Sequence, residues 1–434
     1  MKKKVLSVLL VAAMTASMVA GCGDTNEPVD NNGGNDTQAG AVTPDDGQDV
    51  AVDYGSGTIK IWVAEAVQSL TQQIADDFIA SDEAYSGYTV EVEAVGENDA
   101  AGNMITDVEG GADIYGFAQD QMARLVSAGA LVPVGPYADW IAEQNDAGAV
   151  AAATAGSTVY AFPVTSDNGY FLYYDKSVVT DPTSLEQVTA DCEAAGKNFY
   201  FDISNGWYQT AFFFGTGCEL TYDTDDTGAF TACNIDYASD KGVVALKEII
   251  ELVSSPAFQN GSNMDETTNL GAIACGTWAA SSAKAILGDN YACTKLPSFE
   301  GSDGNTYQLS GFGGFKLLGV KPQEEEGKLA LCLLLAQELT KYESQMARFE
   351  AEGWGPSNLE AQASDAVQAD EALSALAAQL AYTIPQGQYP DGYWTLATSL
   401  GDDVKQGNLT TDTSDEDLMA ALQTFQDTCS SYAQ

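Results

Sequence analysis

Strand and helix patterns alternate along the first part of the folded region of this chain. Segments 58–63, 88–95 and 112–117 read as strands, and the stretches between them read as helices, the second of them over 101–108. The first helix pattern places apolar residues at Val67, Leu70, Ile74 and Phe78. Strand, helix, strand, helix, strand predicts a parallel sheet whose strands are joined by helical crossovers.

A second set of patterns follows and predicts a second sheet. Its strands are expected at 170–175, 198–203 and 272–275, and its helices at 185–195, 207–214 and 241–253. A further helix is predicted near the C-terminal end, over 364–380. At 434 residues the chain is too long for a single hydrophobic core, so two lobes are expected. The predicted fold class is α/β, in which each lobe has a wound, mostly parallel sheet covered by helices.

The order of these patterns predicts where the lobes begin and end. We expect an N-terminal lobe made of residues 57–164 plus 315–352, and a C-terminal lobe made of 169–309 plus 357–434. The predicted hinge lies near residues 163–168, 310–314 and 353–356.

The first residues have the features of an export signal. Lys2, Lys3 and Lys4 precede an apolar stretch over 5–19, and small residues then lead to Cys22. This arrangement resembles a bacterial lipoprotein signal peptide over residues 1–21, and the resemblance implies that Cys22 is lipidated. No later apolar run reaches the length of a membrane span.

Residues 22–56 are rich in Asp, Asn, Gly and Thr. They lack the apolar surface needed to form a core, so we expect a disordered tether between the lipid anchor and the folded body.

Charge and composition exclude several classes of function. The chain has 63 Asp and Glu residues against 17 Lys and Arg, and it has no His. Such a negative surface repels nucleic acid and disfavours an anionic ligand. The absence of His excludes a Ser-His-Asp triad and a His-built zinc site. We therefore expect no cofactor, no metal and no nucleic-acid partner.

The cysteines do not have the spacing of a disulfide framework. Cys218 and Cys233 flank a predicted hairpin over 218–235, which leaves one local disulfide open. The acidic turn of this hairpin, DTDDTG, keeps part of the spacing of a calcium-binding loop. Its twelfth position is Asn234 rather than Glu, so we favour a plain hairpin.

Six stretches carry a family resemblance, and they occur in a fixed order. They are IKIWV, ADIYGFAQDQMARLVSAGALVPV, VYAFPVTSDNGYFLYYDKSVV, ISNGWYQTAFFFGTGC, ACGTWAASSAKAILGDNYACTKLPSFEG and IPQGQYPDGYWTLAT. The chain after the tether resembles the extracellular solute-binding proteins of carbohydrate ABC importers, and looks closest to the maltose and maltodextrin-binding proteins. The resemblance implies a two-lobed, type II periplasmic-binding-protein-like fold whose lobes close over sugar by hinge motion.

The resemblance also implies a sugar site. A sugar needs aromatic rings for its C–H faces and polar side chains for its hydroxyls. Positions that match or adjoin the family's sugar-binding residues are Trp278, Trp394, Trp207, Tyr208, Phe117, Asp120, Asp167, Glu65, Asn205 and Gln121. Maltodextrin binders tend to carry basic residues where this chain has Ala66, Gln121 and Thr398. A pocket without those cations is therefore expected, in which Asp, Asn and Gln orient the hydroxyls of the sugar.

Several of these residues also have a purely structural interpretation. Asp120 and Asp167 suit helix N-caps or turns as well as they suit a sugar site. For Trp278, Trp394 and Trp207 we favour binding, because they fall in loops or at helix starts. The other tryptophans are expected to pack: Trp62, Trp140 and Trp354.

Three functions remain open at this point. The first is a monomeric receptor, lipid-anchored on the outer face of the bacterial cytoplasmic membrane, that captures neutral oligosaccharides such as maltooligosaccharides for the permease subunits of an ABC importer. The second is an exported glycosidase, which needs two carboxylates about 5–10 Å apart. The third is an adhesin for insoluble polysaccharide. The order of the six stretches favours the receptor, so we expect a binding protein and not an enzyme.

Overall fold

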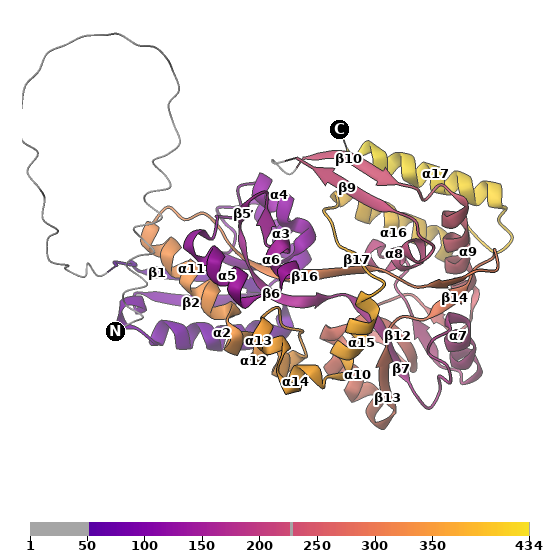
Figure 1. Ribbon diagram of the computed structural model, residues 1–434, viewed down its shortest axis with the longest axis horizontal. Helices are drawn as coiled ribbons and strands as arrows, with labels where there is room; N and C mark the ends of the chain where they lie inside the picture. The colour runs from indigo at the N-terminus through magenta and orange to yellow at the C-terminus, as the bar shows by residue number, and fades with distance from the viewer. Residues whose placement is uncertain (1–51, 226–228, 434) are drawn as a thin grey trace, which may run out of the picture.

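The computed structural model describes residues 52–225 and 229–433, which form two lobes lying side by side (Figure 1). The first lobe contains the N-terminal strands and helix α11 (Glu326–Thr340), and the second contains the C-terminal helix α17 (Asp415–Ser431). The predicted signal peptide, the lipidation site at Cys22 and residues 22–51 of the predicted tether lie outside the described residues. The prediction of a disordered tether as far as residue 56 is wrong at its end, because Tyr54 is 5% exposed and packs in the core of the first lobe. None of the helices in these two ranges has the length and apolar content of a membrane span.

The first lobe is built on a sheet in the order β2–β1–β3–β16, and β6 also pairs with β16. Its strands are β1 (Gly57–Val63), β2 (Tyr88–Ala94), β3 (Ile114–Ala118), β6 (Ala161–Asn168) and β16 (Phe312–Val320). β1 is parallel to both β2 and β3, which confirms the predicted crossovers. Alternate residues of β1 point into the core, where Ile59 and Ile61 pack with Val67 of the first crossover helix, α2 (Glu65–Ala80).

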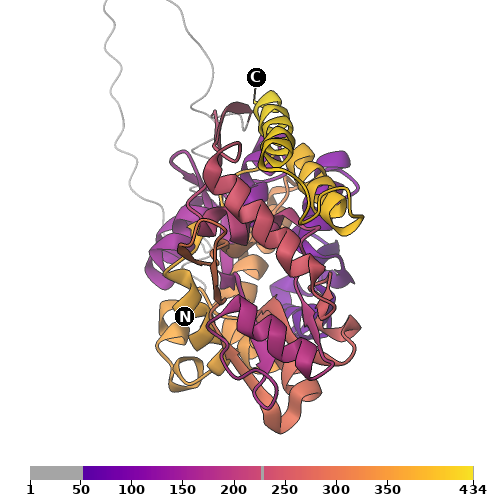
Figure 2. The same cartoon turned by 90° about the vertical axis from the view of Figure 1, so that its right-hand side faces the viewer.

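The second lobe is built on a sheet in the order β11–β8–β12–β7–β13. Its strands are β7 (Tyr170–Asp175), β8 (Asn198–Tyr200), β11 (Phe258–Gln259), β12 (Leu270–Gly276) and β13 (Tyr291–Thr294). The helices packed around this sheet include α7 (Leu185–Ala194), α8 (Gly206–Gly215), α9 (Asp240–Ser254), α10 (Ala280–Leu287) and α16 (Asp391–Lys405). The view onto the outer side of this lobe shows α7, α9 and α17 on the side turned away from the first lobe (Figure 2).

Strands β6 and β16 carry the chain between the two lobes. β6 leads through Gly169 into β7 of the second sheet, and β16 returns to the first sheet. The two strands therefore run in opposite directions and pair antiparallel, as β16 also does with β3. Both sheets are mixed. In the first, β2, β1 and β3 are parallel, whereas β16 is antiparallel to β3 and β6. In the second, β11, β8 and β12 are parallel, whereas β7 is antiparallel to β12 and β13.

A third connection lies against these two strands. Thr165 of β6 forms a β-bridge with Pro356, and the backbone N–H of Ser166 donates to the carbonyl of Gly355 over 3.0 Å. Gly353, just before, has φ +71° and ends helix α12 (Tyr342–Glu352). Segments that are far apart in the sequence thus meet between the lobes.

Two helix boundaries differ from the sequence-based expectation. Helix α3 (Glu97–Thr106) begins before residue 101, which places Glu97 in its first turn. The helix predicted over 364–380 is broken into α14 (Asp365–Gln368) and α15 (Glu371–Leu380). The break arises because the Asp370 side chain accepts the backbone N–H of Leu373 and starts a new helix.

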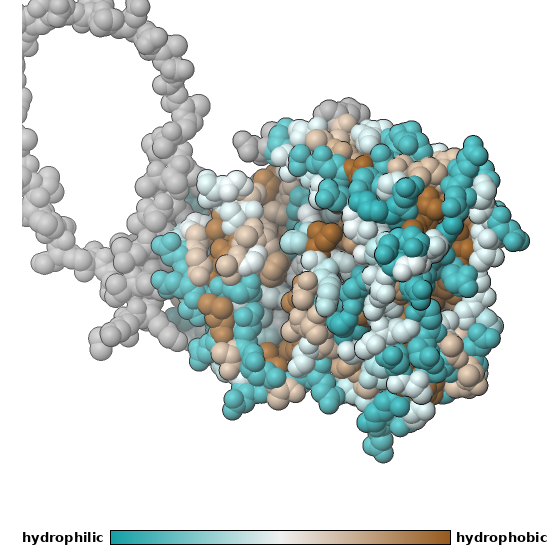
Figure 3. Space-filling view, turned by 45° about the vertical axis from the view of Figure 1, so that its right-hand side comes forward, coloured by the Kyte–Doolittle hydropathy of each residue, from teal (hydrophilic) through white to brown (hydrophobic). Residues whose placement is uncertain are grey.

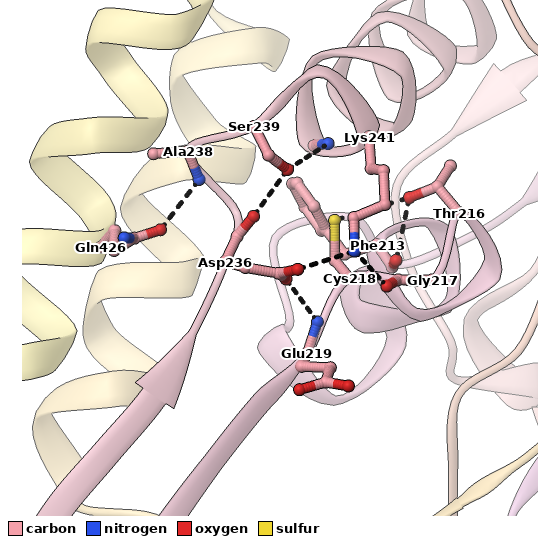
Figure 4. Close-up of polar contacts among 11 residues, drawn as sticks. Phe213, Thr216, Gly217, Cys218, Glu219, Asp236, Ala238, Ser239, Lys241 and Gln426 are labelled. Carbon is pink, nitrogen blue, oxygen red and sulfur yellow. Dashed lines mark hydrogen bonds and ion pairs between the residues drawn. The ribbon is translucent and has the colours of Figure 1, made fainter.

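The predicted hairpin is formed by β9 (Leu220–Thr224) and β10 (Phe230–Ile235), and polar contacts fix its base (Figure 4). Asp236 accepts the backbone N–H of Glu219 at 2.6 Å and pairs with Lys241 of α9 at 2.7 Å. Cys218 and Cys233 are free thiols, so the local disulfide that their positions left open is not formed. The hairpin is held by hydrogen bonds and packing instead.

The face of the molecule drawn in Figure 3 is largely hydrophilic. On the face drawn in Figure 3, hydrophobic residues form small patches separated by hydrophilic ones. This distribution agrees with the formal net charge of −46. Few large hydrophobic residues are exposed in the described chain: Ile286, Leu359, Leu380 and Tyr382.

Candidate functional site

Acidic residues follow the carboxyl ends of three neighbouring strands in the first lobe. Glu65 comes after β1, Glu97 after β2 and Asp120 after β3. Because β2, β1 and β3 are adjacent, the three positions lie along one edge of the sheet. This edge is where open α/β sheets place ligand-binding groups.

Two of the predicted aromatic residues lie together in the second lobe. Trp278 follows β12, and its indole folds back over Gly276, where an added Cβ would be 2.1 Å from the ring. Trp207, at the start of α8, has its ring centroid 5.9 Å from that of Trp278. Its Nε1–H donates to Oε1 of Gln386 over 3.0 Å. Both indoles are half-buried, so together they form one partly accessible aromatic surface.

Trp394 lies on the neighbouring helix, α16. Its ring packs against Tyr389 and Tyr393, with centroids 5.6 and 4.8 Å away. The hydroxyl of Tyr393 donates to the carbonyl of Gly206, the residue before Trp207, over 3.1 Å. The first turns of α8 and α16 are therefore in contact. Trp394 nevertheless belongs to a different ring cluster from Trp207 and Trp278.

Lys316 of β16 brings a cation to the aromatic surface. Its Nζ lies 5.3 Å from the centroid of the Trp278 ring and 4.1 Å from that of Trp354. The Glu97 carboxylate is 3.6 Å from Nζ, and the lysine side chain is only 12% exposed. The crossing strand thus supplies a basic group beside Trp278, whereas the positions of Ala66, Gln121 and Thr398 carry none.

Asp120 is a buried carboxyl group at the end of β3. It accepts a hydrogen bond from Nε2 of Gln121 at 2.6 Å, while its Oδ1 has no partner in the described protein. Burial raises the pKa of Asp120 to about 7, and the Gln121 hydrogen bond offsets part of that rise. Gln121 in turn accepts a hydrogen bond from Arg124 at 2.6 Å.

Asp167 joins elements of both lobes at the end of β6. Its Oδ2 accepts the hydroxyl of Thr277, the residue before Trp278, and the backbone N–H of Gly355 at 2.6 Å. Its Oδ1 has no protein partner, although the residue is 2% exposed. Asp167 therefore holds the Trp278 turn against the crossing segments and keeps one acceptor unused.

Unpartnered buried polar atoms concentrate in this region. Nine such side-chain atoms occur among the described residues, and five of them lie on the strand ends and connections between the lobes. The five are Gln119 Oε1, Asp120 Oδ1, Thr165 Oγ1, Asp167 Oδ1 and Trp354 Nε1. Buried polar groups are nearly always hydrogen-bonded, so this set has the properties of a surface completed by a polar ligand or water.

Direct contacts also link the two lobes beside this surface. Gln388 donates to the carbonyl of Gln119 at 2.9 Å and accepts the backbone N–H of Ala123 at 3.1 Å. Arg124 forms a 2.5 Å ion pair with Asp391 at the start of α16. The lobes therefore meet at residues 119–124 in the structure.

Comparison with known proteins identifies the family. The sequence model of the bacterial extracellular solute-binding proteins matches residues 73–375, which is well over half of the chain. This chain belongs to the bacterial extracellular solute-binding proteins. Membership implies that the protein is exported, and the members are binding proteins rather than enzymes.

Solved structures share the two-lobed fold. One, described as a complex with acarbose, is 25% identical, with a TM-score of 0.77, covering 88% of this chain and 100% of that chain. The unliganded maltodextrin-binding protein MalE1 from L. casei BL23 is 24% identical, with a TM-score of 0.70 and coverage of 86% and 99%. The maltose-maltodextrin-binding protein of Alicyclobacillus acidocaldarius is 20% identical, with a TM-score of 0.69 and coverage of 85% and 100%. No curated protein sequence matches this solute-binding protein.

Four predicted site residues do not contribute to the aromatic surface of Trp207 and Trp278. Two are buried in the cores, one caps a helix and one is exposed. Phe117 is fully buried in the core of the first lobe, and Tyr208 is 5% exposed in that of the second. Neither offers ring surface to a solute in this arrangement. Asn205 is the N-cap of α8 and accepts the backbone N–H of Trp207. Glu65 is exposed in the first turn of α2.

Sequence reasoning missed Lys316, Glu97, Gln386 and the ring face of Trp354. Lys316 is the only charged residue in the apolar strand β16. A single charge in such a strand could have marked Lys316 as a candidate site residue. Glu97 follows a strand end in the same way as Glu65 and Asp120. Trp354 is 5% exposed, as its predicted packing role requires, but one ring face contacts the Lys316 ammonium.

Two surface hollows lie elsewhere on this solute-binding protein. One of about 350 Å³ lies between α7 and α9 and is lined by acidic residues that include Glu186 and Glu248. Another of about 700 Å³ lies between α2 and β2. Each is confined to one lobe and has no tryptophan in its lining, so neither matches the chemistry of the surface between the lobes.

Proposed function

We propose that this protein is the receptor of a carbohydrate importer and binds neutral oligosaccharides between its lobes. The preferred ligands are maltose and maltooligosaccharides. One observation carries this proposal. The paired rings of Trp207 and Trp278 occur in the same region as Asp120 and Asp167, each of which has an unpartnered carboxyl oxygen. Indole faces suit the C–H faces of a sugar, and carboxylates are strong acceptors for its hydroxyls.

The solved relatives support the same class of solute. Their descriptions name acarbose, maltotriose and maltose as ligands. Carried over to this chain, they suggest a linear α-glucan or a close analogue.

The proposed mechanism is closure of the lobes about the crossing segments. We place the hinge near 163–168, 310–314 and 353–356, where β6, β16 and the third connection lie against one another. A ligand that contacts both lobes binds the closed form more tightly and shifts the equilibrium toward it. Asp167 is suited to this coupling, because it contacts Thr277 of one lobe and the connection at Gly355.

The location and partners follow from the N-terminal sequence and the family. We propose that Cys22 is lipidated, that residues 22–51 tether the body to the outer face of the cytoplasmic membrane, and that the closed form delivers sugar to ABC permease subunits.

Isothermal titration calorimetry with maltotriose, acarbose and cellotriose tests the proposal. We expect saturable binding of maltotriose and acarbose with micromolar affinity, about −8 kcal/mol, and weaker binding of cellotriose. Chromatography of the titrated sugar checks for shortened products, which would indicate a hydrolase. If none of a full panel of neutral oligosaccharides binds to the protein, the proposed receptor function is wrong.

A further inference from the structure

We propose that Lys316 is a ligand-binding residue of this site and that its ammonium donates to an oxygen of the bound sugar. The inference rests on the proposed function and adds a residue that neither the resemblance nor the comparisons assign. No described residue accepts a hydrogen bond from the Lys316 ammonium, and its contacts are two indole faces and one carboxylate at 3.6 Å.

The Lys316 ammonium therefore has N–H groups without a hydrogen-bond acceptor. It has three N–H donors, and water is largely excluded because the side chain is 12% exposed. The Glu97 oxygen is beyond hydrogen-bond distance, so the ion pair leaves the donors directed elsewhere. Cation–π contact with Trp278 and Trp354 stabilises the charge but does not use the donors as hydrogen bonds do.

Other unused polar atoms belong to residues that pair with Lys316 or adjoin its contacts. Thr165, which is opposite Lys316 in the pairing of β6 with β16, has an unpartnered Oγ1. Trp354, whose ring faces the ammonium, has an unpartnered Nε1–H. The next residue, Gly355, donates to Asp167, whose Oδ1 is also unused. All three side chains are at least nine-tenths buried.

This combination selects the chemical class of the ligand. Lys316 and Trp354 offer donors only, Asp167 offers an acceptor, and Thr165 offers both. A hydroxyl group both donates and accepts, so neighbouring hydroxyls satisfy the whole set. A carboxylate or phosphate accepts only and would face Asp167 and Glu97. An amine cation would face Lys316. The geometry therefore points to a neutral polyhydroxylated ligand.

The test uses calorimetry with maltotriose on the wild type, Lys316→Met and a matched control, Lys328→Met. Lys328 is a partly buried lysine of the same lobe that is paired with Asp113. We expect the Kd to rise at least tenfold for Lys316→Met and to stay within twofold of the wild type for the control. Wild-type binding with an unchanged Kd for Lys316→Met overturns this inference and leaves the proposed function intact. No wild-type binding of any neutral oligosaccharide overturns both.

Two further variants separate ligand binding from a structural role. Glu97→Gln removes the ion pair but keeps the ammonium, so we expect its Kd to rise less than that of Lys316→Met. A rise as large as that of Lys316→Met would show that Lys316 acts through Glu97 and would overturn the inference. If Lys316→Met does not fold, Trp354→Phe decides, because it removes the Nε1–H donor and part of the indole while keeping an aromatic ring beside the ammonium. We expect at least fivefold weaker binding, and a Kd within twofold of the wild type would overturn the inference.

Discussion

The ring centroids of Trp207 and Trp278 lie 5.9 Å apart, although one residue opens a helix and the other follows a strand of the second lobe. Gln386 receives the indole N–H of Trp207 on one side, and Lys316 lies over the ring of Trp278 on the other. The proposed site is thus assembled from residues that are distant in the sequence.

Removing either indole should weaken sugar binding. Trp278→Ala and Trp207→Ala are each expected to reduce the affinity for maltotriose by about 1–3 kcal/mol, because stacking area is lost. Calorimetry measures the change. Trp62→Ala serves as the control, since this partly buried indole donates to Glu93 at the edge of the first lobe. Equal losses in all three variants would show a general effect on folding rather than a site.

A single methyl group at Gly276 should displace the Trp278 platform. The added Cβ would lie 2.1 Å from the indole, while the backbone φ of −94° is open to any residue. Gly276→Ala is therefore expected to weaken maltotriose binding about as much as Trp278→Ala, with altered tryptophan fluorescence. At Gly102 a Cβ meets no atom within 4 Å, so Gly102→Ala should bind normally. Unchanged binding by Gly276→Ala would contradict the placement of the ring.

The buried carboxyl of Asp120 should make stability depend on pH. Its pKa in the folded protein is about 7, above the value of 3.8 for an unperturbed Asp, so the folded state holds a proton that the unfolded state has released. Stability is therefore lost as the pH rises from about 4 to 7, and the loss levels off above that range.

Asp120→Asn removes this titration. Compared with the variant, the wild type should lose about 2 kcal/mol of unfolding free energy between pH 5.5 and 8.5. Guanidinium unfolding at several pH values measures the difference. A constant difference across this range would mean that Asp120 is not buried as the structure describes.

The ion pair between Arg124 and Asp391 should favour contact between the lobes by a modest amount. Asp391 is 69% exposed, so we expect a coupling of about 0.5–1 kcal/mol that decreases at high salt. A double-mutant cycle of Arg124→Gln and Asp391→Asn on maltotriose affinity measures it. Strictly additive effects at low salt would show that the pair does not contribute to closure.

Much of the fold was predictable because it depends on local periodicity. The alternation in β1 and the helical spacing from Val67 to Phe78 are short-range signals, and both elements form as predicted. The break before α15 was missed, because capping by Asp370 competes with an otherwise continuous helical pattern.

The candidate site was predictable only in part. Loop position and family order pointed to Trp207 and Trp278, and the structure brings these two together. Phe117 and Tyr208 were proposed on the same grounds but lie within the cores, since position in a motif does not determine which way a side chain points. Lys316 was missed because its role depends on contact with Trp354, which arises only when β16 crosses between the lobes.

The most direct test of the central claim is a crystal structure of the protein grown with saturating maltotriose. We predict a glucose ring stacked on the Trp207–Trp278 surface between the lobes, with hydroxyls about 2.7–3.2 Å from Asp120 or Asp167. Maltotriose bound on the outer face of one lobe, or an interlobe surface free of sugar at saturation, would contradict the account.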